Sequence, residues 1–176
     1  DFMKETNFQF NELVTSIESV HSEALAHASK AVNISLTMRN WLIGCYICEF
    51  ELHGADRAEY GENLLGEISK RLQKNNIKRT QVRDLNIYRQ FYKIFPQIQQ
   101  SLSANFTNLL PTSISQIDEM ISGSNYTSSI WSSLTTKFQL PGIQLVTKLS
   151  FTHLVELILI SDNAERFFHE VECIKG

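Results

Sequence analysis

A chain of 176 residues, of which 43% are hydrophobic and 20% charged, is long enough to bury the core of one domain, and it is not the composition of a disordered tail. No run of about 18 apolar residues occurs, and the N-terminus lacks the regions of a signal peptide, so we expect a cytoplasmic protein without a membrane partner. The net charge of −3 is unevenly distributed, because the window from Lys70 to Lys93 holds eight basic residues and one acid. That window carries +7 and the rest of the chain −10.

The first segment, residues 1–56, is predicted to be one very long helix or two helices in line. From Phe8 to Phe50 there is no proline, and Gly44 is the only glycine. If the segment forms two helices, the break between them is expected from His27 to Asn33, where small and polar residues collect. Helical patterns longer than about 25 residues often signal helix pairing, so this segment is also the candidate for a homodimer contact. The expected apolar stripe consists of Leu13, Ile17, Val20, Ala24, Ala28, Ala31, Val32, Leu36, Ile43, Tyr46, Ile47 and Phe50.

Residues 57–96 contain two amphipathic segments joined by a short basic turn, which is the pattern of a helix-turn-helix. Asn75-Asn76 is expected to end the first segment, whose stripe is formed by Tyr60, Leu64, Leu65, Ile68 and Leu72. The second segment is expected to begin at Thr80 as N-cap and to end at Pro96. Its apolar face is formed by Leu85, Tyr88, Phe91, Tyr92 and Phe95.

The polar side of the second segment favours nucleic acid as the partner. At 100° per residue, one arc of about a third of the circumference holds Arg83, Asn86, Arg89, Gln90 and Lys93. Side chains of these types read bases and hold phosphates. The preceding turn adds Lys70, Arg71, Lys74, Lys78 and Arg79. We therefore predict that the turn captures phosphates of double-stranded DNA and that the second helix enters the major groove, although the same face could be merely solvated.

The remaining chain is predicted to complete a mainly α fold. Residues 97–148 form a connection in which serine and threonine dominate from Ser101 to Thr136, with short helices expected at 115–121 and 130–138. A small hairpin at Pro141-Gly142 could act as a wing beside the helix-turn-helix. In residues 149–176, Ser150 is the expected N-cap of a helical block that is interrupted at 162–163 and closes the same domain over the first helix.

No catalytic or metal centre is predicted in this chain, and no cofactor motif occurs. Cys45 and Cys48 form a CxxC pair, but a zinc site needs four ligands and neither a second pair nor paired histidines accompany it. We therefore interpret the two cysteines as small buried residues in a helix interface. His153 lies near a helix start without a nucleophile or a third ligand, which favours a hydrogen-bonded structural role.

A specific combination of landmarks is spread through the chain. RAEYG at 57–61 is followed by RQFY at 89–92 and then by LSFTH at 149–153. The further landmarks are Val32-Asn33, Ile43-Gly44, Ile47, Gly54, Leu85, Pro96 and Arg166-Phe167-Phe168. Together they resemble the N-terminal domain of the YhcG family, bacterial proteins in which a PD-(D/E)xK-type nuclease domain follows a helical N-terminal domain. The chain departs from that family at 76–80, where a glycine-rich turn is usual, and at Phe151, where a tryptophan is usual.

The resemblance implies a DNA-binding or target-recognition module of a larger nuclease. The catalytic domain would then begin beyond Gly176, so that this chain is a fragment and not itself an enzyme. The alternative is a protein-interaction or dimerisation module of a nuclease or restriction-like complex, which the long first segment also favours.

Overall fold

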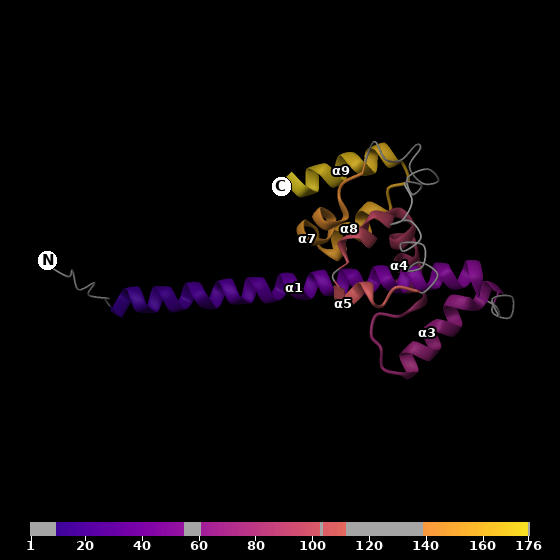
Figure 1. Cartoon of the computed structure of the whole chain (residues 1–176), viewed down its shortest axis with the longest axis horizontal. Coiled ribbons are helices and arrows are strands. Elements are labelled where there is room, and N and C mark those ends of the chain that lie inside the picture. Colours follow the sequence, from indigo (N-terminus) through magenta and orange to yellow (C-terminus); the bar gives the residue numbers. More distant parts are fainter. Residues whose placement is uncertain (1–9, 55–60, 103, 112–138, 176) are drawn as a thin grey trace.

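The computed structural model describes residues 10–54, 61–102, 104–111 and 139–175, and this part of the chain is helical without a strand. The predicted mainly α class is therefore confirmed. Figure 1 shows one very long helix, crossed near its C-terminal end by the other helices. The elements are α1 (Phe10–His53), η1 (Gly61–Asn63), α3 (Leu64–Lys74), α4 (Val82–Ile94), η2 (Pro96–Ser101), α5 (Ala104–Thr107), α7 (Gly142–Lys148), α8 (Phe151–Ile158) and α9 (Asn163–Lys175).

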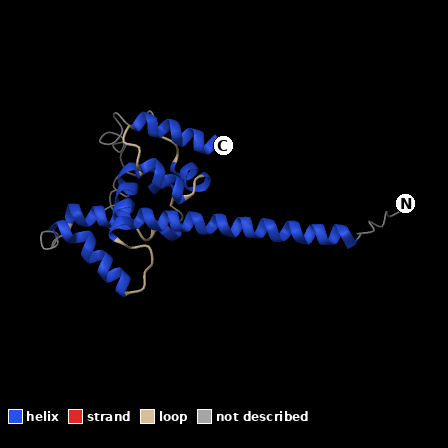
Figure 2. Cartoon of the chain, turned by 180° about the vertical axis from the view of Figure 1, so that it is seen from behind, coloured by secondary structure: helices blue, strands red, loops and turns tan. Residues whose placement is uncertain are grey.

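The first helix, α1, runs through 44 residues without interruption, which makes it about 66 Å long. The break considered between His27 and Asn33 does not occur, because the small residues around it are mainly alanines, the best helix formers. The N-terminal half projects away from the other helices, and every residue from Phe10 to Val32 is exposed (Figures 1 and 2). The remaining helices form a globular head on the C-terminal half of α1.

The head is centred on the crossing of α1 and α4. The two backbones approach so closely that a Cβ on Gly44 would lie 1.9 Å from the carbonyl oxygen of Tyr88. The Trp41 indole N–H donates to the carbonyl oxygen of Phe95 at 3.0 Å, which joins the two helices a second time. From the other side, the Phe151 ring packs against Tyr88 and Phe91 with ring centroids 5.8 and 5.4 Å apart. The predicted apolar face of α4 is confirmed, since Leu85, Tyr88, Phe91 and Phe95 are at most 2% exposed and Tyr92 is half-buried.

The predicted stripe of α1 is wrong for its C-terminal half. There the helix buries a different face, formed by Thr37, Met38, Asn40, Trp41, Leu42, Gly44, Cys45, Ile47 and Cys48. Of the predicted stripe residues in this half, only Ile47 is buried, whereas Leu36 and Tyr46 are 46% and 50% exposed. Because apolar side chains surround the helix almost completely here, periodicity could not select the face that α4 covers.

The segment between α3 and α4 begins as predicted and ends one residue later than predicted. Asn76 has a φ of 57°, and the amides of Asn76 and Ile77 bond to the carbonyl oxygens of Gln73 and Leu72, so α3 ends in a Schellman motif. The N-cap of α4 is Gln81 and not Thr80. The buried Thr80 hydroxyl instead donates to the carbonyl oxygen of Ile77 at 2.7 Å, which ties the segment together.

The hairpin predicted at Pro141-Gly142 does not form. Pro141 occupies the N-cap position of α7, where its carbonyl oxygen accepts the amides of Gln144 and Leu145. Gly142 lies against η2, where an added Cβ would come within 2.4 Å of the carbonyl oxygen of Gln97. Proline before a run such as Gly142–Lys148 suits the first turn of a helix as well as it suits a turn. The wing is therefore absent at this place, and the short helices predicted at 115–121 and 130–138 lie outside the described residues.

The C-terminal block begins at the predicted N-cap, Ser150, and its interruption lies at 159–162, slightly earlier than the predicted 162–163. The Ser150 hydroxyl accepts the amide of His153 at 3.3 Å, and His153 Nδ1 faces the amide of Ser150 at 3.4 Å, which closes a capping box. His153 is thus hydrogen-bonded at the helix start, as predicted. Arg166 of α9 donates to the carbonyl oxygen of Ile160 at 2.8 Å and so caps the end of α8. Within the described residues, no helix is long and apolar enough to cross a membrane.

Candidate nucleic-acid interface

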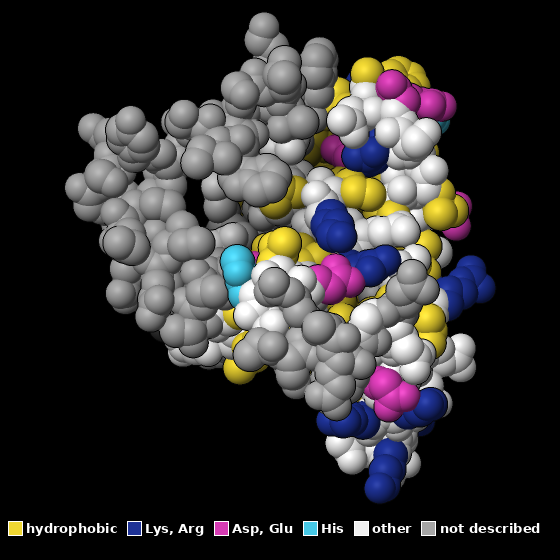
Figure 3. All heavy atoms as spheres, turned by 90° about the vertical axis from the view of Figure 1, so that its right-hand side faces the viewer, with side chains coloured by type: hydrophobic (Ala, Val, Ile, Leu, Met, Phe, Trp, Pro, Cys, Tyr) yellow, Lys and Arg dark blue, Asp and Glu magenta, His cyan; other side chains and the backbone are white. Residues whose placement is uncertain are grey.

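The free end of the α3–α4 pair carries a concentration of exposed cations. Seen from the end of the molecule, Lys and Arg side chains gather at the lower edge, over α3 and the segment that follows it (Figure 3). Between Leu64 and Asp84 the sequence places six basic and two acidic residues. The basic end, as we call it below, consists of Lys70, Lys74, Lys78, Arg79 and Arg83, all of which are exposed.

The two acids near the basic end are each engaged locally. Glu67 accepts from the Lys70 ammonium at 2.7 Å, and this contact lowers the pKa of the Glu67 carboxyl. Asp84 accepts the backbone amide of Gln81 at 3.3 Å as part of the capping box of α4. Because Glu67 neutralises part of Lys70, the strongest positive field lies around the other four cations of the basic end.

The connection between the helices holds these cations outward. It spans residues 75–81, which is longer than the turn of about three or four residues in a typical DNA-binding helix-turn-helix. Arg79 has a φ of 57°, and its carbonyl oxygen accepts the Tyr88 hydroxyl at 3.0 Å, so the backbone is anchored to the core while the side chain is exposed. A glycine would adopt this left-handed conformation more readily than an arginine, but it would carry no charge.

The predicted residues further along α4 lie in a different environment. Arg89 donates to Glu51 of α1 at 2.6 Å and to the Asn86 side-chain oxygen at 2.8 Å. Lys93 lies 3.8 Å from the same Glu51 carboxylate, and Gln90 is half-buried. The structure therefore brings these side chains together as predicted, but it turns the polar side of α4 partly toward α1. Arg89 already has internal partners, and base contacts from this stretch would compete with them.

Sequence reasoning missed two residues of α1 that shape this region. Arg39 donates to the carbonyl oxygen of Lys78 at 3.2 Å and to the Asn40 side-chain oxygen at 3.0 Å. It therefore holds the connection between α3 and α4 against α1 and adds positive charge beside it. Glu51 neutralises the C-terminal part of α4, as described above. Neither residue had a local signal, because both lie far from the 70–93 window in sequence and meet it only when α1 crosses α4.

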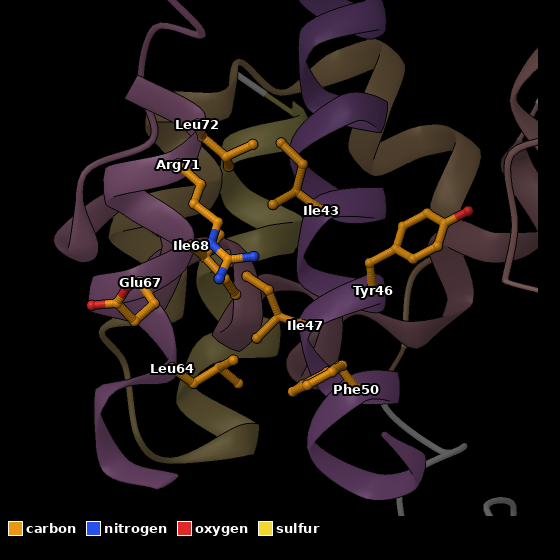
Figure 4. A pocket seen from close by; sticks show the side chains of 9 residues that line it. All are labelled: Ile43, Tyr46, Ile47, Phe50, Leu64, Glu67, Ile68, Arg71 and Leu72. Carbon is orange, nitrogen blue, oxygen red and sulfur yellow. The ribbon is translucent and has the colours of Figure 1, made fainter. Parts of the chain in front are cut away.

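Arg71, predicted with the basic end, lies beside an apolar groove between α3 and α1. The groove has a volume of about 530 Å³ and is lined mainly by aliphatic side chains and Phe50. In Figure 4 the Arg71 guanidinium reaches over the groove toward α1, whereas Tyr46 points away from α3. The Tyr46 hydroxyl donates to the carbonyl oxygen of Leu109 at 2.8 Å. Arg71 thus borders an apolar surface, which differs from the solvent-exposed polar setting of the other cations.

The CxxC pair is part of the core, as interpreted from the sequence. Cys45 and Cys48 are buried on the face of α1 that meets α4, and the Cys48 thiol lies 3.9 Å from the carbonyl oxygen of Arg89. Burial raises the pKa of the Cys45 thiol to about 12 and also raises that of Cys48. Among the described residues, no group of three or more His, Cys, Asp or Glu side chains is arranged to hold a metal ion. Both thiols are therefore neutral packing residues at physiological pH.

The fold and this surface define an all-α domain whose helix pair presents a basic end. A family model described as the DUF1016 N-terminal domain matches residues 16–119, more than half of the chain, and the chain belongs to this family. Comparisons with curated proteins and with solved structures gave no match.

Segments beyond the matched range pack onto it. The Asn33 side chain donates to the carbonyl oxygen of Leu149 at 3.2 Å, which joins two of the sequence landmarks 116 residues apart. Phe151, Tyr88 and Gly44 form a second such meeting point at the crossing of α1 and α4. The landmarks at 57–60 lie outside the described residues. Asn33, Gly44, Tyr88, Leu149 and Phe151 thus converge on the packing of one core, whereas Val32 and Phe168 are 58% and 60% exposed.

Proposed function

We propose that this chain is the non-catalytic DNA-binding or target-recognition module of a larger PD-(D/E)xK-type nuclease of the YhcG kind, and that its basic end contacts the phosphates of double-stranded DNA. The single observation that supports this most is the exposed cluster of Lys74, Lys78, Arg79 and Arg83 on the end of a helix pair. Cations in such a cluster repel one another, so an anionic partner would stabilise it.

Two further features support phosphate contact as the principal interaction. The cations lie on two helix ends and the segment between them, which suits a backbone of regularly spaced charges better than a single small anion. Arg89 and Asn86, the side chains best suited to reading bases, already bond to each other and Arg89 to Glu51. Binding should therefore depend more on charge than on base sequence.

The test is fluorescence anisotropy of the purified chain with labelled duplex DNA over a series of salt concentrations. Neutralisation of about four phosphates gives a slope of log K against log salt near −3.5, at about −0.9 per phosphate. The double variant Lys74→Glu/Lys78→Glu should lose about two of these contacts, so the slope should fall to about −2 and the affinity at low salt by more than tenfold.

The matched control is Lys148→Glu/Lys175→Glu, which makes the same change of net charge on exposed residues of α7 and α9. Its slope should equal that of the unaltered chain. Absence of binding at low salt, or an equal loss in both variants, would contradict the proposal. Comparison of unrelated duplex sequences at one salt concentration separates phosphate contact, which predicts similar affinities, from base reading by α4, which predicts a preferred sequence.

A function in protein interaction is supported by a different observation, the exposed apolar side of the N-terminal half of α1. That surface is remote from the basic end along the helix, so the two functions do not compete for the same residues.

A further inference from the structure

The N-terminal half of α1 exposes large apolar side chains along its whole length. The exposed fractions range from 38% for Val14 to 76% for Phe10, with Ile17 at 59% and Val20 at 68%. Most of the stability of a helix in a protein comes from packing of its apolar face rather than from intrinsic helix propensity. The stripe, as we call it below, consists of Phe10, Leu13, Val14, Ile17, Val20, Ala24, Leu25, Ala28, Ala31 and Val32.

The stripe is one-sided, and the exposed His21 is the polar residue that falls within its arc. At 100° per residue, its members fall within an arc of about 140°, whereas Glu12, Glu23 and Lys30 lie on the other side. The head does not cover it, because the contacts of α1 with the head begin at Asn33, whose side chain donates to the carbonyl oxygen of Leu149. Farther along α1, Arg39 also contacts the head, because its side chain donates to the carbonyl oxygen of Lys78. The open surface is therefore a helix face of defined length, from residue 10 to about residue 32.

We propose that the stripe pairs with the stripe of a second copy of this chain in antiparallel orientation. The resulting homodimer has its two heads at opposite ends of a two-helix stalk.

The exposed apolar area of the stripe is consistent with a second copy of this chain as its partner. At roughly 170 Å² for a large apolar side chain, the exposed fractions correspond to on the order of 600 Å² per chain before the alanines are included. This is at the upper end of the largest apolar patch on a typical monomer and close to the roughly 800 Å² per partner of a standard interface. A long, narrow face of this kind is complementary to another helix, and the same helix of a second copy supplies one of equal length.

Side-chain size selects the antiparallel orientation. The first part of the stripe is large, from Phe10 to Val20, whereas three of its last five members are alanine, so antiparallel pairing places large side chains opposite mostly small ones. Glu12, Glu23 and Lys30 lie on the side of α1 away from the stripe, so their charges do not distinguish the two orientations.

The oligomeric state of the whole chain tests the pairing, measured by sedimentation equilibrium without DNA. The unaltered chain should be a dimer at tens of micromolar, and Ile17→Asp/Val20→Asp should weaken dimerisation by more than a hundredfold. The matched control Thr15→Asp/Ser19→Asp adds the same charges on the opposite side of α1 and should remain a dimer. The near-ultraviolet spectrum should be the same in all three proteins, because these positions do not contact the head.

The orientation is tested by electron–electron distance measurement on a spin label at Asn11→Cys, with Cys173→Ser to remove the exposed native cysteine. Antiparallel overlap of residues 10–32 separates the two labels by about 20 residues, or roughly 30 Å. A label distance near 10–15 Å would overturn the antiparallel orientation. A monomeric unaltered chain, or a stripe variant that dimerises as well as the control, would overturn the pairing itself, and neither result would bear on DNA binding by the basic end.

Discussion

The two halves of α1 are parts of one uninterrupted helix, yet they have opposite environments. Met38 and Trp41 in the C-terminal half are 3% and 0% exposed, whereas Ile17 and Val20 in the N-terminal half are 59% and 68% exposed. Both halves have an apolar face, and the difference is that α4, α7 and α8 cover one of them. Helical periodicity therefore indicates that a face needs cover, but it does not identify what provides the cover.

The backbone contact between α1 and α4 should give the largest effect. Gly44→Ala places a methyl group against the carbonyl oxygen of Tyr88, and the backbones can separate only by opening the core. We expect a loss of about 3 kcal/mol or more in the free energy of unfolding, measured by urea denaturation. Ser29→Thr adds the same methyl group to the exposed half, away from the stripe, and should change the value by less than about 0.5 kcal/mol. Similar losses in both variants would mean that the two halves do not differ as described.

The ion pair between α4 and α1 should give the next largest effect. Arg89→Glu places a carboxylate beside Glu51 and breaks the bond to Asn86, so we expect a loss of about 2 kcal/mol in urea denaturation. Arg83→Glu reverses an exposed charge six residues earlier and should cost less than about 0.5 kcal/mol. Equal costs would indicate that Arg89 is not part of the contact between α1 and α4. Charge reversal at Arg89 is for this reason a poor test of DNA binding.

A buried carboxyl in α9 should make the stability of the head depend on pH. Burial raises the pKa of Glu170 from 4.5 to about 7, with Arg166 opposing part of the shift. The contribution of protonated Glu170 to the free energy of unfolding is fully present below pH 4.5. It is lost as the pH rises toward 7, because the carboxyl loses its proton more readily in the unfolded chain than in the folded one. Glu170→Gln should therefore raise the free energy of unfolding by about 2 kcal/mol at about pH 8 and leave it nearly unchanged at about pH 4. A pH-independent difference would show that Glu170 acts through packing alone.

Removal of the exposed half should give the smallest effect on the head. A chain that begins at Ala31 retains Asn33 and every buried residue of α1, so its unfolding free energy should lie within about 1 kcal/mol of that of the whole chain at concentrations low enough to keep both monomeric. The same chain should no longer dimerise. Cooperative unfolding of the truncated head, followed by circular dichroism, is the measurement. Loss of the folded head would mean that the N-terminal half stabilises it directly.

Local chemistry predicted those parts of the structure that depend on neighbours in sequence. Asn75-Asn76 ends α3 because asparagine tolerates the left-handed conformation that a Schellman motif needs, and Ser150 begins α8 because its hydroxyl caps free amides. The concentration of cations from Lys70 to Arg83 was also visible, since charge does not depend on the fold. At Pro141-Gly142 the same local reasoning was wrong, because proline and glycine suit a helix start against η2 as well as a hairpin.

The sequence by itself therefore determined a mainly helical chain, most of its helix ends and the position of its basic end, because capping, periodicity and charge act over a few residues. Only the tertiary structure decided which face of α1 is core, that Arg89 bonds to Glu51, and that Arg39 braces the basic connection. These contacts join residues about 40 positions apart, and they form because Gly44 lets α4 lie directly on α1. The physical reason is that helices with apolar side chains on several sides can pack in several ways, and the closest backbone approach selects one of them.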